Sequence, residues 1–400
     1  MKKLRLLLLG LLLLSFSNAM AQSFYSSRGV GIVRYFVSGR GVGMGGVGLS
    51  ISGPLTVNYI NPAAIVAHPL TTITGNFFHE SVSLNGTALN GSISDTNVGG
   101  FQFVVPIQRN FLAIALGLVP YTSIEYAFVS QGTFKGVPFN ERISGDGGVN
   151  IGFFSFAFKP IERLYVGAMG MLYFGNLRNF WRVDFETREF VDIRDEVRRG
   201  FTAGGIRGGF ILHLSKRWSV AGVYSPSVNL NANRSIRLRF GEVDNFGENK
   251  DIDLPKAYGF GTSFMLGKLL AAADVYFEKW SEVENSNGFV NDSKRIAFGV
   301  EYSGRGSFEA SYFSRVALRA GIYYRDLGLE EPAGAKVTEL FGTFGLGLPI
   351  KWRASRLDFA IEAGRRGSLS SNPIKETVVR ITGTITIGER WFYRGGRINR

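Results

Sequence analysis

Residues that could carry metal or acid–base chemistry are few and far apart in this chain. The only histidines are His68, His79 and His213, and none has a second ligand at a metal-binding spacing. The chain has no cysteine, which excludes disulfides, a thiolate nucleophile and lipid attachment through cysteine. The sequence has no Ser/His/Asp or His/acid grouping that suits a catalytic site. We therefore expect a protein that is not an enzyme and that holds no metal and no cofactor.

Two further patterns resemble binding motifs but lack the surroundings that those motifs need. Acidic residues gather in 184–196 and 241–253 without the fixed spacing of a calcium loop, so we expect solvated loops, with surface calcium as the alternative. Gly41, Gly43 and Gly46 spell G-x-G-x-x-G, yet neither a strand–helix unit nor a following acidic residue accompanies them. Glycines at this density instead allow close backbone packing.

Charged residues that alternate with apolar residues indicate which way the chain faces. In 269–278, 315–324, 356–363 and 379–387, apolar residues take every second position. A carboxylate turned toward hydrocarbon costs on the order of several kcal/mol, so the charged face must point away from lipid. If these segments are strands of a membrane barrel, we expect their charged residues to form an ion-pair network inside it that stabilises the barrel wall. The alternative is a polar gate or a site for a ligand headgroup. The residues predicted to face the lumen are Asp274, Glu278, Arg319, Asp358, Glu362 and Arg380.

The same alternation repeats in about fourteen segments after residue 70. Tight joints near 107–110, 159–162, 214–217 and 267–268 alternate with long polar loops over 85–95, 130–143, 182–196, 229–255, 282–293, 326–338 and 366–376. This alternation of tight turns and long loops is typical of an antiparallel barrel in an outer membrane, and a soluble β-sandwich would not need it. We predict an all-β fold, a transmembrane 14-stranded antiparallel β-barrel. The expected strands are 70–84, 96–107, 111–129, 143–159, 162–181, 197–214, 217–228, 256–267, 269–281, 294–303, 315–325, 339–348, 356–365 and 377–391.

Tryptophans near the strand ends fit an interfacial aromatic belt, because an indole ring pairs an apolar body with a polar edge. The belt is expected to include Trp181, Trp218, Trp280, Trp352 and Trp391.

The first residues have the composition of a secretory signal peptide. A positive head at residues 2–5 precedes an apolar run over 6–14, and Ala19-Met20-Ala21 is a cleavage motif. We expect removal of residues 1–21 by cleavage between Ala21 and Gln22, and a mature protein in the cell outer membrane. The formal charge of +13 is scattered rather than gathered in one stripe. It therefore favours contacts with membrane lipids and lipopolysaccharide, and not with nucleic acid.

Residues 22–69 do not fit the strand ladder. A fourteen-stranded barrel is too wide to be filled by its own inward side chains, so it must be a water-filled pore or be plugged. We expect 22–69 to form an N-terminal plug, or hatch, and 70–393 to form the barrel. A basic tail over 394–400 follows the aromatic end that the outer-membrane assembly machinery commonly reads, and it is expected in the periplasm or on a partner.

Three stretches of the chain resemble the FadL/TodX family of outer-membrane transporters of hydrophobic compounds. Residues 39–48, followed by Asn61-Pro62-Ala63, resemble the family's hatch. Residues 112–126 resemble its third strand, and 253–280 resemble its mid-barrel hairpin. The resemblance implies passive transport of hydrophobic small molecules, long-chain fatty acids being the best-known class. It also implies a lumenal pocket and a hatch-gated lateral exit at an inward kink of the third strand.

The resemblance places Asn61, Pro62 and Ala63 beside that lateral exit. Gly117 and Pro120 are our candidates for the kink, because both residue types interrupt a ladder, although a proline near a strand end can be ordinary. Two other functions stay open. Related barrels act in type IX secretion, where the long loops would bind a protein cargo or secretion partner. A general porin is the other alternative.

Overall fold

The computed structural model describes most of the mature chain. The expected signal peptide (1–21) and the basic tail (394–400) lie outside the described residues. Within the described part, no helix is long and apolar enough to cross a membrane. The described ranges are 23–35, 38–53, 57–86, 90–187, 189–238, 241–244, 251–284, 288–289, 291–304, 311–330, 334–350 and 355–391.

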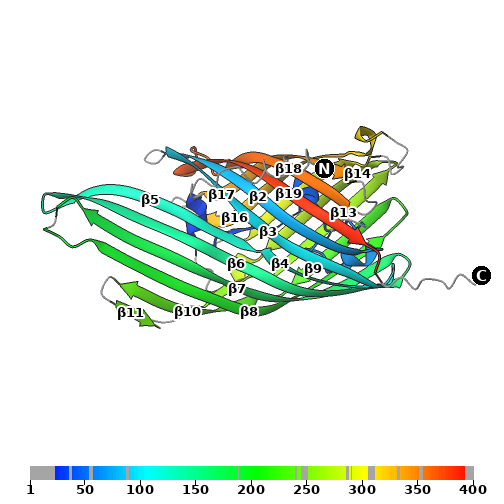
Figure 1. Cartoon of the computed structure of the whole chain (residues 1–400), viewed down its shortest axis with the longest axis horizontal. Helices are drawn as coiled ribbons and strands as arrows, with labels where there is room; N and C mark the ends of the chain where they lie inside the picture. The colour runs from blue at the N-terminus through cyan, green and yellow to red at the C-terminus, as the bar shows by residue number, and fades with distance from the viewer. Residues whose placement is uncertain are drawn as a thin grey trace, which may run out of the picture.

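The wall is a closed antiparallel barrel of fourteen strands, which confirms the predicted fold (Figure 1). Three wall strands are interrupted and carry two labels each. The barrel closes where the last strand pairs with the first, from Ile374↔Gly86 to Glu389↔Thr71. The wall elements are β2 (Thr71–Gly86), β3 (Asn90–Gln108), β4 (Leu112–Pro120) with β5 (Thr122–Phe134), β6 (Val137–Ile161), β7 (Leu164–Phe185), β8 (Ile193–His213), β9 (Trp218–Ser225) with β10 (Val228–Leu238), β12 (Ile252–Leu254) with β13 (Ala257–Leu266), β14 (Leu269–Glu278), β15 (Ser293–Tyr302), β16 (Ala317–Glu330), β17 (Lys336–Pro349), β18 (Ser355–Arg366) and β19 (Ile374–Glu389).

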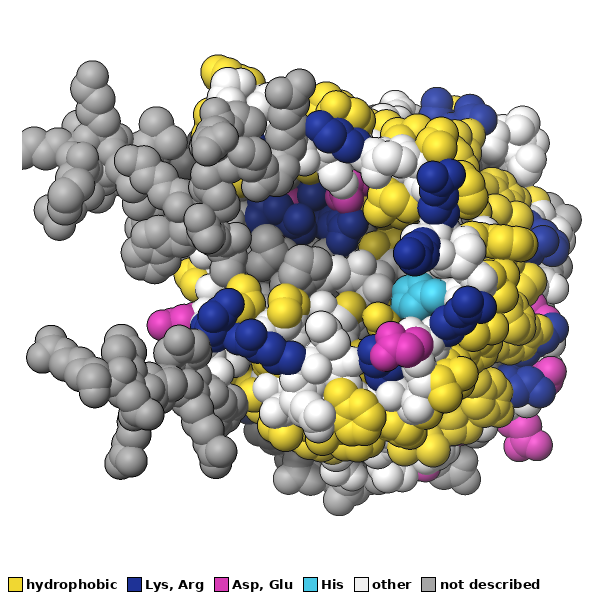
Figure 2. All heavy atoms as spheres, turned by 90° about the vertical axis from the view of Figure 1, so that its right-hand side faces the viewer, with side chains coloured by type: hydrophobic (Ala, Val, Ile, Leu, Met, Phe, Trp, Pro, Cys, Tyr) yellow, Lys and Arg dark blue, Asp and Glu magenta, His cyan; other side chains and the backbone are white. Residues whose placement is uncertain are grey.

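The outer face of the barrel is apolar, whereas the inner face is largely polar on β14 to β19 with β2 and largely apolar on β4 to β10. On β19, Ile381 and Ile385 are exposed while Thr382 and Thr384 are buried. This is the period-two pattern that a lipid-facing strand requires. Figure 2 looks onto one end of the barrel and shows hydrophobic side chains around the flank, with Lys and Arg side chains on the end that faces the viewer.

The predicted aromatic belt is only partly right. Trp181, Trp218 and Trp391 are exposed, whereas Trp280 is 1% exposed and its ring stacks on Phe289 at a centroid distance of 4.0 Å. The short helix η3 (Trp280–Glu282) turns Trp280 inward, away from the lipid. Trp352 lies outside the described residues.

One expected long loop continues instead as paired strands. The range 130–143 belongs to β5 and β6, which meet at a tight turn where Lys135 and Gly136 have positive φ values of 49° and 84°. Polar residues can pair in a ladder outside the hydrocarbon, so polarity alone does not end a strand. Figure 1 shows β5 to β8 extending past the end of β2. A small strand, β11 (Gly241–Asp244), likewise pairs with β10.

The N-terminal segment, residues 23–67 as described, contacts opposite walls of the barrel. Its element α2 (Gly39–Gly43) contacts β16 to β19, and η2 (Pro62–Ala67) contacts β4 and β6 to β8. The other two elements, η1 (Phe24–Ser27) and β1 (Ile32–Val33), contact β5. The segment therefore lies in the lumen.

Candidate functional site

A first cluster of buried ion pairs joins the N-terminal segment to the wall through Arg40. Its guanidinium lies 2.6 Å from Glu301, which also pairs at 2.6 Å with Arg319. Arg319 reaches Asp358 at 2.7 Å, and Arg356 lies 2.8 Å from the same carboxylate. The side chain of Arg319 is 0% exposed, so its charge depends on these partners.

A second cluster surrounds Arg34 of the N-terminal segment. Arg34 lies 3.8 Å from Glu80, and Arg380 donates to that same carboxylate. Arg380 also pairs with Glu362 at 2.8 Å, and the Tyr323 hydroxyl donates to Glu362 at 3.0 Å. The wall carboxylate of Glu80 is thus shared by one wall arginine and one N-terminal arginine.

A third cluster is centred on Arg366, which is 1% exposed. Arg366 pairs with Glu339 and with Glu376, each at 2.6 Å. Ser23 donates from its hydroxyl to Glu376 at 2.8 Å, and Arg325 lies 3.7 Å from Glu339. Each of the three clusters therefore includes a residue of the N-terminal segment.

The six lumenal residues expected from the sequence do not form one network. Arg319 and Asp358 belong to the first cluster, and Glu362 and Arg380 belong to the second. Asp274 instead accepts hydrogen bonds from the backbone N–H groups of Gly48 and Leu49, at 2.6 and 2.9 Å. Glu278 accepts one from the indole of Trp280 at 3.3 Å.

Several cluster members were missed at the level of sequence. They are Arg34, Arg40, Glu80, Glu301, Glu339, Arg366 and Glu376. The wall members lie on the inward side of their strands, and their registers pair opposite charges, as in Glu362↔Arg380 and Arg380↔Glu80. The inward/outward alternation along each strand, combined with the strand register, is the signal that could have identified these residues.

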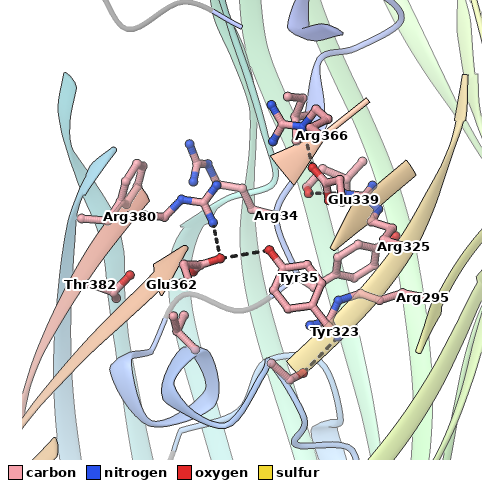
Figure 3. A pocket seen from close by; sticks show the side chains of 15 residues that line it. Arg34, Tyr35, Arg295, Tyr323, Arg325, Glu339, Glu362, Arg366, Arg380 and Thr382 are labelled. Atoms are coloured by element: carbon pink, nitrogen blue, oxygen red, sulfur yellow. Dashed lines mark hydrogen bonds and ion pairs between the residues drawn. The ribbon is translucent and has the colours of Figure 1, made fainter. Parts of the chain in front are cut away.

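A small cavity of about 60 Å³ lies where the second and third clusters meet (Figure 3). Arg295 lines it, donates to the carbonyls of Gly45 and Gly46 at 2.6 and 3.2 Å, and lies over the Tyr323 ring at 4.6 Å. The lining is rich in positive charge and suits an anionic group. Its charged members are Arg34, Arg295, Arg325, Arg366, Arg380, Glu339 and Glu362.

The opposite side of the lumen is apolar, and the Asn-Pro-Ala motif lies there. Asn61 caps η2 by accepting from the Ala63 N–H at 3.0 Å, and it donates to Leu49 O at 2.7 Å and to Phe210 O at 3.2 Å. A Cβ on Gly209 would lie 2.3 Å from the Asn61 Oδ1 atom, so only glycine permits this approach of η2 to the wall.

The wall is open between β3 and β5. Residues 90–100 of β3 pair with β2, and β3 joins its other neighbour only from Phe101↔Leu118 onward. The opening has a cavity of about 800 Å³ with a polar lining that includes Asp95, Asn97, Ser123 and Glu125. The N-terminal strand β1 covers one edge of the opening, because Ile32 pairs with Ser123.

The structure separates the two kink candidates. Pro120 ends β4 and lines the opening, and the strand resumes as β5 after Tyr121. Gly117 stays in the regular ladder, opposite Gln102 on one side and Phe153 on the other. None of Asn61, Pro62 and Ala63 is among the described residues that line this opening. The motif contacts β7 and β8 instead.

The loop between β14 and β15 packs on the N-terminal segment through its described residues. A Cβ on Gly29 would collide with the ring of Phe289, the stacking partner of Trp280. Lys279 donates to Asp292 at 2.6 Å, and this hydrogen bond raises the pKa of Lys279. Partial burial acts to raise the pKa of Asp292, but hydrogen bonds from Lys279 and Ser281 outweigh it and hold that pKa below its ordinary value.

In the ranges that the structure covers, no group of three or more His, Asp or Glu side chains could hold a metal ion. What the lumen offers is an arginine-rich cavity, an apolar side and an opening in the wall.

Comparison with known proteins assigns the family. The sequence model of the family described as BamG matches residues 1–399. The chain belongs to the BamG family. No curated protein matches the chain.

Solved structures of this fold are FadL-like, as the sequence resemblance predicted. A Pseudomonas aeruginosa FadL homologue has a TM-score of 0.62 at 12% identity, over 88% of this chain and 98% of its own. The Ralstonia pickettii toluene transporter TbuX has a TM-score of 0.59 at 14% identity, over 88% and 98%. The Pseudomonas putida toluene transporter TodX has a TM-score of 0.59 at 14% identity, over 90% and 99%. At these identities the likeness concerns the fold.

Proposed function

We propose that this protein is a passive outer-membrane transporter of hydrophobic small molecules, gated by its N-terminal segment. The observation that carries the proposal is the pairing of β1 with β5 at the open seam between β3 and β5. A strand that covers a wall opening from inside is placed to act as a gate, because its movement changes access from the lumen to the lipid. The N-terminal segment would thus be both plug and hatch.

The outer-membrane location rests on the signal-peptide pattern and on the apolar outer face of the barrel. There the protein would contact membrane lipids and lipopolysaccharide, after insertion by the assembly machinery. A general porin is less consistent with the lumen, since the N-terminal segment packs against both walls.

The preferred cargo in this proposal is amphipathic, as in the long-chain fatty-acid class. The arginine-rich cavity suits a carboxylate, and the apolar side of the lumen suits a hydrocarbon chain. Two similar structures are toluene transporters, which supports an apolar cargo in general. The polar lining of the seam argues for a cargo with a polar head rather than a bare hydrocarbon.

In the proposed sequence of steps, the ligand enters from the end of the barrel that carries the longer loops. Its anionic head reaches the arginines around Arg34 and competes with Glu80 and Glu362 for them. Because Arg34 directly follows β1, release of Arg34 from the wall would loosen the pairing with β5. The ligand would then leave sideways through the seam.

A staple across the seam tests this exit. Because the chain has no cysteine, Asn97→Cys with Ser123→Cys gives two unique thiols on opposite sides of the opening. We expect a bifunctional maleimide to abolish uptake of a fluorescent long-chain fatty acid into proteoliposomes, while the unreacted double variant stays active. The control pair Ile361→Cys and Ile381→Cys joins two wall strands elsewhere and should stay active after the same treatment. Full uptake by the stapled protein would exclude this exit.

A second candidate function, binding of a protein cargo in secretion or surface assembly, is favoured by the projecting strands. Residues 126–134 of β5 pair with β6 and carry no charged residue. An uncharged strand edge is suited to pairing with another chain. Stoichiometric co-purification of a protein with the native barrel, lost on Val129→Lys, would support this candidate. Purification of the barrel alone after chemical cross-linking in cells would count against it.

A further inference from the structure

The wall has a second interruption, between β8 and the chain that joins β9 to β10. The pairing of β8 with β9 ends at Gly208↔Tyr224, and its pairing with β10 begins at Thr202↔Asn231. Residues 203–207 therefore face 225–230 without ladder pairs. On the other side only residues 226–227 and 255–256 are unpaired, between Ser225↔Ala257 and Val228↔Leu254. The wider gap is therefore on the β8 side, next to Pro226, which has no N–H to donate.

An apolar recess of about 620 Å³ opens at this interruption. Outward-facing and inward-facing residues both line it, so the recess enters the thickness of the wall. The outward group is Gly152, Phe154, Gly170, Leu172, Gly204 and Ile206, and the inward group is Met171, Gly205 and Val228. Phe154, Leu172 and Ile206 are 51–64% exposed on the lipid-facing surface.

Glycines form the floor of the recess, although the neighbouring residues leave room for larger side chains there. A Cβ on Gly170 or on Gly204 would meet nothing within 4 Å. The registers place Phe154, Gly170 and Ile206 in one row across three strands, with Gly170 between two bulky side chains. Two strand spacings make this trough roughly 10 Å wide. The recess therefore exists because Gly170 and Gly204 have no side chains to fill it.

The inner end of the recess abuts the apolar side of the lumen. A Cβ on Gly205 would lie 2.8 Å from the Tyr173 ring and 3.0 Å from the Val228 side chain, so these two side chains close the recess from inside. Met171 and Tyr173 belong to the same hydrophobic cluster as Tyr59 of the N-terminal segment. The recess is therefore a blind apolar pocket rather than a water path.

We propose that this recess binds an acyl chain of a bilayer lipid. It opens on the lipid-facing surface between exposed apolar residues, where bilayer hydrocarbon is the surrounding medium. An apolar void there gains dispersion contacts when a methylene chain fills it. The acyl chain lies over Gly170 and Gly204 with its end toward Val228. This assignment does not depend on transport through the seam between β3 and β5.

Filling the recess tests the assignment without disturbing the fold. In the double variant Gly170→Leu/Gly204→Leu, the new side chains begin in open space and occupy the position of the acyl chain. Gly342→Leu is the matched control, because Gly342 is an exposed wall glycine on β17 whose Cβ would also meet nothing within 4 Å. Heat-modifiable migration in gels verifies that each barrel is folded.

The primary readout is native mass spectrometry of the full-length mature protein released from nanodiscs of one defined phosphatidylethanolamine. We expect one retained phospholipid on the unaltered protein and on Gly342→Leu, and about tenfold lower occupancy on the filled variant, since several buried methylenes are displaced. Equal retention by all three proteins, or no retained lipid on the unaltered protein, would overturn the proposal.

A local readout complements the mass measurement. Ser227→Cys is exposed at the rim of the recess and is the only thiol in the chain, so it can carry a bimane fluorophore. Lipids brominated along their acyl chains should quench this fluorophore strongly, and the two leucines should reduce that quenching severalfold. Quenching unchanged by the leucines means that no chain occupies the recess.

Discussion

The two sides of the lumen hold the N-terminal segment in different ways. The side formed by β14 to β19 with β2 uses directional bonds. Asp274 accepts from Gly48 and Leu49, and Arg295 donates to Gly45. At β6 to β8 the segment is held mainly by close apolar packing of η2. Directional bonds fix one register, whereas apolar packing tolerates sliding, so the charged side defines the position of the segment.

This difference also separates stability from positioning. A buried ion pair must offset the dehydration of both charges, so the three clusters are weak evidence for high stability. Their role in this account is to specify where the segment sits. The apolar contacts supply the larger non-specific attraction. Three sets of substitutions test this contrast.

The largest effect is expected from Arg319→Met on the charged side. The change leaves the buried carboxylates of Glu301 and Asp358 with a missing partner, which should cost about 3–5 kcal/mol. The measurement is unfolding in detergent followed by gel migration. Arg178→Met is the control, because the Arg178–Asp146 pair is 48% and 41% exposed and should contribute less than about 1 kcal/mol. Similar losses in both variants would contradict the importance of burial.

A smaller effect is expected from Ile65→Ala on the apolar side. Ile65 is 2% exposed within the hydrophobic cluster, so truncation should cost about 2–4 kcal/mol. Hydrogen exchange should speed up in residues 57–67 and stay unchanged around α2. A uniform increase over the whole N-terminal segment would show that the two sides are not held independently.

The smallest effect is expected at the cap of η2. Asn61→Ala removes the cap on Ala63 and the bonds to Leu49 and Phe210, at a cost of about 1–2 kcal/mol. Asn61→Ser keeps a side-chain oxygen at the N-cap but loses both donated bonds, so it should lie between Asn61→Ala and the unaltered protein in protease resistance of the segment. Identical resistance of both variants would assign the whole effect to the donated bonds.

Sequence patterns predicted the wall better than the contents of the lumen. The inward direction of Asp358 and Glu362 followed from period two, because every second residue of a lipid-facing strand must be apolar. The alternation along a strand shows which face of the sheet a side chain is on, but not which residue it contacts. It could not reveal that Asp274 binds backbone N–H groups of residues far away in the chain. The same limit explains Trp280, whose direction depends on the short helix η3 rather than on a strand.

The Asn-Pro-Ala motif illustrates the remaining difficulty. The structure starts η2 at this motif, with Asn61 as its N-cap and Pro62 at its first position. Which wall strands the motif meets depends on how the N-terminal segment folds inside the barrel, and local sequence carries no signal for that. Proline chemistry predicts the break after Pro120, whereas the strand expected over 217–228 runs across the interruption beside Pro226.

Gating by the N-terminal segment requires β1 to part from β5 during transport. Ile32→Cys with Ser123→Cys places a thiol pair at one cross-strand position of that pairing, in a chain without other cysteines. The direct measurement is uptake of a fluorescent long-chain fatty acid by proteoliposomes that hold the oxidised double variant. We predict loss of uptake when the disulfide is formed and recovery after reduction. Full uptake with the disulfide intact would contradict the account.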